Sequence, residues 1–89
     1  MDSMVRVHDS EAILLGEALV THDGPDIISC IEGILPQWGD DGQAYSIYRV
    51  DGSYVVVLGE YQDLHDLRIA GALFEGACER VSSGIIRGV

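Results

Sequence analysis

The chain has 89 residues, which allow one small domain, residues 1–89, and exclude a second hydrophobic core. Hydrophobic residues make up 47% of it, too many for intrinsic disorder, yet no uncharged apolar stretch is long enough to span a bilayer. Five arginines and no lysine stand against fifteen aspartates and glutamates, and the formal net charge of −10 disfavours direct contact with nucleic acid, because phosphate groups are bound by clusters of Lys or Arg.

The N-terminal part of the chain offers a short candidate strand at residues 4–7 and then a longer apolar run at residues 11–20. The apolar run fits either a deeply buried helix or a strand, because periodicity does not separate the two in so short a segment. We predict a helix, capped by the side-chain oxygen of Asp9 or Ser10. Gly16 weakens this reading, since glycine is a poor helix former.

A second helix has clearer boundaries. Asp23-Gly24 predicts a turn, and Pro25 falls at the first helical position, where its missing amide hydrogen costs nothing. Apolar residues then recur at helical spacing until Pro36 ends the helix. Trp38, in the loop that follows, is expected to fold back as a lid over the core.

The strongest local signal is a β-hairpin at residues 43–50 and 53–58. Both segments are rich in Tyr, Ile and Val, and the two residues between them, Asp51 and Gly52, are typical of a type I′ turn. The turn predicts the cross-strand pairs Val50–Ser53, Arg49–Tyr54, Tyr48–Val55, Ile47–Val56 and Tyr45–Leu58.

The second face of this hairpin, which includes Tyr48, Val55 and Val57, is more apolar than a solvated face should be. A two-stranded hairpin is marginally stable alone, so a further element is expected to cover this face or to pair with a hairpin edge. The candidates are residues 4–7, the tail at residues 85–89, or a second copy of the chain.

A long helix is expected from Leu64 to about Ser82. Asp63 is a suitable N-cap, and apolar side chains recur along one face of the segment at helical spacing. Gly84 is expected to end this helix.

These elements predict an α+β fold with two N-terminal helices, a β-hairpin and a long C-terminal helix packed on the sheet. A third strand from residues 4–7 extends the hairpin in one version of this fold. Residues 1–8 and 84–89 are expected to be flexible or docking ends. Cys30 and Cys78 are expected to be buried thiols on helix faces, because free cysteine commonly behaves as a small core residue. A disulfide between the two helices is the alternative, which only an oxidising compartment would favour.

No group of residues favours catalysis. Each of the three histidines, His8, His22 and His65, is followed by an aspartate, but the pairs lie in separate regions and each aspartate suits a helix start, so we predict no metal site. Glu75 and Glu79 are expected on a solvated face, no serine has a basic partner, and no glycine-rich phosphate loop occurs. We therefore expect neither enzymatic activity nor a cofactor.

The predicted function is that of a small acidic protein-binding module in the cytoplasm, since the N-terminus lacks a basic region followed by an apolar one. In its sharpest form it is an inhibitor or immunity-type protein that occupies a basic surface of a nucleic-acid-handling partner. The alternative is a homodimeric structural or adaptor protein without catalytic activity, whose charge serves solubility. Biased genomic composition or a high-salt habitat also accounts for the missing lysine and asparagine.

The hairpin and the loop before it form the predicted contact surface, because tyrosine is enriched at interfaces and carboxylates attract a basic partner. The same tyrosines also suit strand packing. The predicted partner-binding residues are Trp38, Asp40, Asp41, Tyr45, Tyr48, Asp51, Tyr54, Val55 and Val57.

Overall fold

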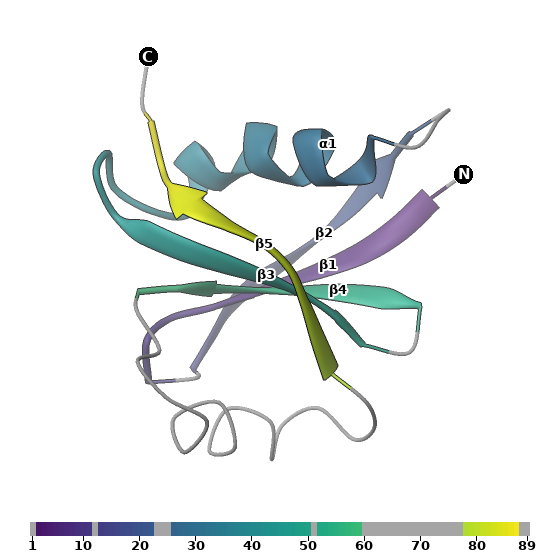
Figure 1. Cartoon of the computed structure of the whole chain (residues 1–89), viewed down its shortest axis with the longest axis horizontal. Helices are drawn as coiled ribbons and strands as arrows, with labels where there is room; N and C mark the ends of the chain where they lie inside the picture. Colours follow the sequence, from purple (N-terminus) through teal and green to yellow (C-terminus); the bar gives the residue numbers. More distant parts are fainter. Residues whose placement is uncertain (1, 12, 23–25, 51, 60–77, 88–89) are drawn as a thin grey trace.

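The computed structural model describes residues 2–11, 13–22, 26–50, 52–59 and 78–87. These residues form a five-stranded mixed sheet with one short helix, α1, on one of its faces (Figure 1). The elements in chain order are β1 (Asp2–His8), β2 (Leu14–Thr21), α1 (Ile27–Ile34), the short 3-10 helix η1 (Leu35–Gln37), β3 (Ala44–Val50), β4 (Ser53–Leu58) and β5 (Cys78–Ile85).

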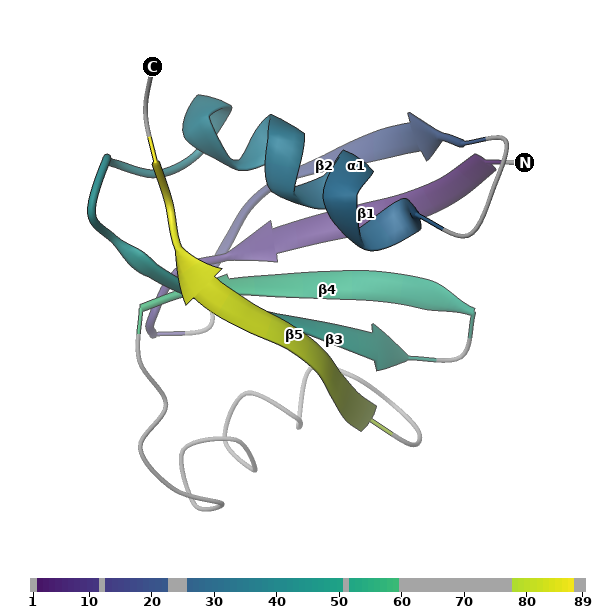
Figure 2. The same cartoon turned by 45° about the horizontal axis from the view of Figure 1, so that its top comes forward.

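The strands lie in the order β2-β1-β4-β3-β5 (Figure 2). Neighbouring strands run antiparallel, except that β1 and β4 are parallel. A parallel pair needs a crossover connection in place of a tight turn, and here the chain between β1 and β4 forms β2, α1 and β3. The described part of the chain contains no helix that is long and apolar enough to cross a membrane.

The predicted hairpin is confirmed residue by residue. β3 and β4 pair antiparallel, with Tyr45 opposite Leu58 at the open end and Val50 opposite Ser53 at the turn. Gly52 has a φ of +80°, which the two-residue turn requires and glycine adopts without strain.

Both edges of the β3–β4 hairpin are paired, whereas the sequence predicted only that a further element would cover its second face or pair with one edge. The strand predicted at residues 4–7 is confirmed as part of β1, which lies beside β4. The C-terminal segment also docks, because β5 lies beside β3 and Ile86 is only 3% exposed. The Ile86 amide donates to the Gln43 carbonyl at 2.8 Å, and the Gly42 amide donates to the Ile86 carbonyl at 2.8 Å.

The helix predicted at residues 11–20 is wrong, because Leu14–Thr21 form strand β2, which pairs with β1. The Asp9 carboxylate does accept hydrogen bonds from the backbone amides of Glu11 and Ile13, each at 2.9 Å, but the turn that it holds leads into a strand. A short apolar run suits both structures, and only pairing with β1 decides between them.

The long C-terminal helix predicted from Leu64 to Ser82 is also wrong. Residues 64–77 lie outside the described residues, but Cys78–Ile85 form strand β5, antiparallel to β3. A strand there satisfies backbone groups of β3 that would otherwise be left as an open sheet edge. The predicted fold class is therefore replaced by a mostly β architecture with one short helix in its described part.

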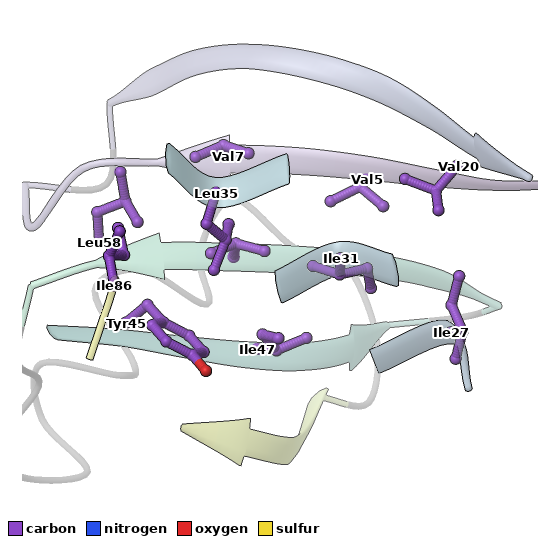
Figure 3. Close-up of a cluster of buried hydrophobic side chains, with 11 residues drawn as sticks. Val5, Val7, Val20, Ile27, Ile31, Leu35, Tyr45, Ile47, Leu58 and Ile86 are labelled. Atoms are coloured by element: carbon purple, nitrogen blue, oxygen red, sulfur yellow. The ribbon is translucent and has the colours of Figure 1, made fainter. Parts of the chain in front are cut away.

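The core lies between α1 and the sheet (Figure 3). The second predicted helix is confirmed, and its Ile27 and Ile31, with Leu35 of η1, recur every four residues and face the strands. Ile31 is 0% exposed, and truncation of such a side chain to Ala typically costs about 2–5 kcal/mol. The remaining members of this cluster are Val5, Val7, Val20, Tyr45, Ile47, Val56, Leu58 and Ile86.

Trp38 packs against this core as the predicted lid. Its indole ring lies over Gly16 of β2, so closely that a Cβ at Gly16 would come within 2.2 and 2.3 Å of two ring carbons. Glycine at this position therefore leaves the space that the ring occupies.

We predict that Gly16→Ala destabilises the protein by about 1–3 kcal/mol, because the added methyl group displaces the Trp38 ring. Urea unfolding measures the change. Gly33→Ala in α1 is the matched control, since a Cβ there meets nothing within 4 Å, and it should stabilise the helix by up to about 1 kcal/mol. Equal effects of the two substitutions would contradict the placement of Trp38.

Candidate functional site

The predicted partner-binding residues fall into different environments. Tyr45, Tyr48, Val55 and Val57 of the hairpin are at most 7% exposed, so their side chains contribute mainly to packing. The other predicted residues are spread: Tyr54 and Trp38 are half-buried against the core, Asp40 and Asp41 are exposed in the loop before β3, and Asp51 lies outside the described residues. The structure thus brings those of these residues that it describes to no common open surface, and the role of the whole set in binding stays a prediction.

Exposed apolar side chains gather elsewhere, in the hairpin formed by β1 and β2. Of the six large hydrophobic side chains that are exposed in the described part of the chain, five belong to this hairpin, and the sixth, Ile85, lies in β5 at the opposite edge of the sheet. We call these five residues the hairpin patch: Met4, Ile13, Leu14, Leu15 and Leu19, with exposed fractions from 38% to 60%.

The pleat of the sheet determines where part of the patch points. Val5 and Val20 face α1 in the core, so their neighbours Met4 and Leu19 point to the opposite face of the sheet. Met4 and Leu19 are direct cross-strand partners and lie side by side. On the same face of the sheet, Val57 of β4 is 0% exposed, so the exposed apolar surface formed by Met4 and Leu19 does not extend to Val57.

The hairpin that carries the patch is acidic. Residues 2–21 contain four carboxylates and one arginine, Arg6. The Arg6 guanidinium lies 3.6 Å from the carboxylate of its cross-strand partner Glu17, and both side chains stay about half exposed, at 50% and 47%. At the open end of the hairpin, the Thr21 hydroxyl donates to the Asp2 carboxylate at 2.9 Å. Since one arginine opposes four carboxylates, the β1–β2 hairpin has an excess of negative charge.

A buried phenol and a carboxylate join α1 to the sheet. The hydroxyl of Tyr45 on β3 donates a hydrogen bond to Glu32 of α1. Burial, the hydrogen bond to Glu32 and the negative charge of Glu32 together raise the pKa of Tyr45 to about 12, and burial contributes most. Gly84 of β5 allows the ring to approach, because a Cβ there would lie 2.7 Å from the Tyr45 hydroxyl oxygen. This pair is part of the packing between helix and sheet.

The histidines and carboxylates of the described segments do not cluster. Among these residues no group of three His, Cys, Asp or Glu side chains could hold a metal ion. His8 is buried in β1, whereas the ring nitrogen Nε2 of His22 lies 3.5 Å from the Ser3 hydroxyl near the other end of the hairpin. His65 lies outside the described residues.

No protein-family model matches the chain, and no curated protein or solved structure is significantly similar to it. The function therefore has to be inferred from its own residues.

Sequence reasoning missed the hairpin patch because it assigned residues 11–20 to a buried helix, in which every apolar side chain would have been covered. One signal was available, since Glu17 interrupts the run and Gly16 disfavours a helix. Those two residues favour a strand that lies at the border of a sheet and is covered on one face only.

We predict that replacement of Tyr45 by Phe removes a pH-dependent part of the stability. An unfolded tyrosine titrates near pH 10, and a folded-state pKa of about 12 means that the neutral phenol is favoured by folding. This contribution is fully present below pH 10 and is lost as the pH rises through about 12. Thermal unfolding from pH 8 to 12 should show a decline for the unaltered chain that is smaller for Tyr45→Phe.

Tyr54→Phe, which changes a half-buried tyrosine on the same sheet, is the control and should retain the full decline. An equally steep decline for Tyr45→Phe would contradict the assignment of this transition to the Tyr45–Glu32 pair.

Proposed function

We propose that this protein is a non-catalytic protein-binding module whose contact surface is the hairpin patch. The observation that carries the proposal is the gathering of five of the six exposed large hydrophobic side chains of the described residues on one hairpin. Exposed apolar side chains that gather in one region commonly mark an interaction site, whereas apolar residues scattered singly need no explanation. An apolar centre with polar residues around it is also the usual composition of an interface.

The charge of the chain supports a basic partner. A protein with a formal net charge of −10 attracts positively charged surfaces over a distance and repels acidic ones. In the sharpest form of the proposal, the protein is an inhibitor that occupies a basic surface of a nucleic-acid-handling protein, with Glu17 and the other acids of the hairpin at the rim of the contact. Rim charges chiefly raise the rate of association and its sensitivity to salt.

A homodimeric adaptor is the second candidate, because the same exposed patch could be covered by a second copy of the chain. Repulsion between two chains of net charge −10 opposes this arrangement at low salt. The two candidates therefore differ in their oligomeric state.

We predict a monomer by light scattering at both low and high salt. Such a monomer leaves the hairpin patch accessible to a different protein. A dimer at both salt concentrations, converted to a monomer by Leu19→Asp, would replace the proposed module by the homodimeric adaptor.

We predict that the double substitution Leu15→Ser and Leu19→Ser weakens binding of the partner at least tenfold, because apolar contact area in the patch is lost. Proteins captured from the source lysate by the unaltered chain would be purified and titrated calorimetrically against the chain and its variants. Ile85→Ser is the matched control, since this exposed apolar residue lies on the opposite edge of the sheet. Equal affinities of the double variant and of the control would refute the patch as the contact surface.

A further inference from the structure

The outer edge of β2 is the part of the hairpin patch that can offer main-chain hydrogen bonds to a partner. β2 is an end strand of the sheet, and its inner edge is paired with β1 from Leu14 to Thr21. Within the described part of the chain, no other strand is paired with it. Because each strand has two edges, the outer edge of this eight-residue strand carries backbone donors and acceptors for another strand.

The two end strands of the sheet differ in composition, and the difference favours β2 over β5 as the strand beside which another strand can be added. β5, at the other end, combines charged and small polar residues, Glu79, Arg80, Ser82 and Ser83, with Gly84, a composition that discourages pairing. β2 instead exposes Leu14, Leu15 and Leu19 along its length. A long end strand with exposed apolar side chains is a template for an added strand.

We propose that a partner of this protein adds an extended strand to the outer edge of β2, and that this strand carries a Lys or Arg two residues from an apolar side chain. The proposal rests on the proposed function, since it specifies how the hairpin patch binds.

The spacing follows from the pleat of the sheet. Glu17 and Leu19 are two residues apart on β2, so they lie on the same face, opposite to α1. A neighbouring strand places its own alternate side chains beside them, at a similar distance to that of a cross-strand pair. An apolar side chain would then contact Leu19, which is 60% exposed, and a basic side chain two residues away would contact Glu17.

Charge decides between a foreign strand and a second copy of the chain. The four carboxylates of residues 2–21 are opposed by Arg6 alone among Lys and Arg, and that arginine already contacts Glu17. A second β2 strand would bring another acidic hairpin against this one, whereas like charges beside each other in a sheet are destabilising. A strand with basic and apolar side chains complements both the negative charge of the hairpin and the exposed leucines of β2.

The test uses an end-capped synthetic peptide of eight residues, Val-Thr-Lys-Thr-Val-Thr-Lys-Thr, in which valine and lysine stand two residues apart and therefore lie on one face of a strand. It is titrated at low salt into the isotope-labelled full chain, and binding is followed by NMR. We expect amide shift changes concentrated in β2 and β1, slower hydrogen exchange of β2 amides, and an affinity that falls as salt is added. Glu17→Gln should weaken binding about threefold, as is typical of one exposed ion pair. The same peptide with glutamate in place of both lysines should not bind.

Two controls separate strand addition from other modes. A valine-lysine peptide that is N-methylated at alternate residues, on the edge that would face β2, lacks the required donors and should not bind. Equal binding of this peptide would overturn strand addition but leave the hairpin patch as a side-chain contact surface. Shift changes around Asp40 and Asp41 with none in β2 would also overturn it, because the peptide would then follow charge alone.

Failure of the proposed function gives a different result. In that case the substitutions Leu15→Ser and Leu19→Ser leave the affinity for the captured partner unchanged, whatever the peptide does. If the chain alone is a dimer that Leu19→Asp dissociates, a second copy occupies the edge and the foreign strand is excluded as its occupant.

Discussion

The parallel pairing of β1 with β4 is the constraint on which the rest of the structure depends. It places Val5 and Val7, both 0% exposed, beside the central hairpin, and it leaves the other edge of β1 for β2. A parallel pair cannot be closed by a tight turn, so the chain must cross over between these strands. That connection contains α1, whose apolar stripe closes the core from one side (Figure 3).

This arrangement also explains why apolar side chains are exposed at the β1–β2 end of the sheet. The helix covers the face that carries Val5 and Val20, whereas Met4 and Leu19 point away from it and stay exposed. The outermost strand, β2, thus combines a covered face, an apolar open face and an outer edge. The proposed function depends on this combination, since apolar side chains, nearby carboxylates and backbone groups lie together on one hairpin.

The sequence correctly predicted the elements whose structure is determined by residues that lie close together in the chain. The hairpin register follows from two turn residues, of which Gly52 supplies a positive φ. α1 follows from the helical spacing of its apolar residues, although it begins at Ile27, after the N-cap Asp26, and not at Pro25 as predicted. Both signals act within a few residues. The two wrong predictions concern segments whose state depends on a distant partner: β2 requires β1, and β5 requires the free edge of β3.

The sequence by itself therefore determined the hairpin of β3 and β4, one amphipathic helix and an acidic composition, and it offered residues 4–7 as a candidate strand, because turn chemistry, periodicity and charge are properties of neighbouring residues or of composition. Only the tertiary structure decided that residues 14–21 are a strand and that Tyr48, Val55 and Val57 are buried. It also decided where the exposed apolar residues gather. Burial depends on which elements lie against each other, and an apolar segment has the same sequence whether it lies inside the core or at an open edge.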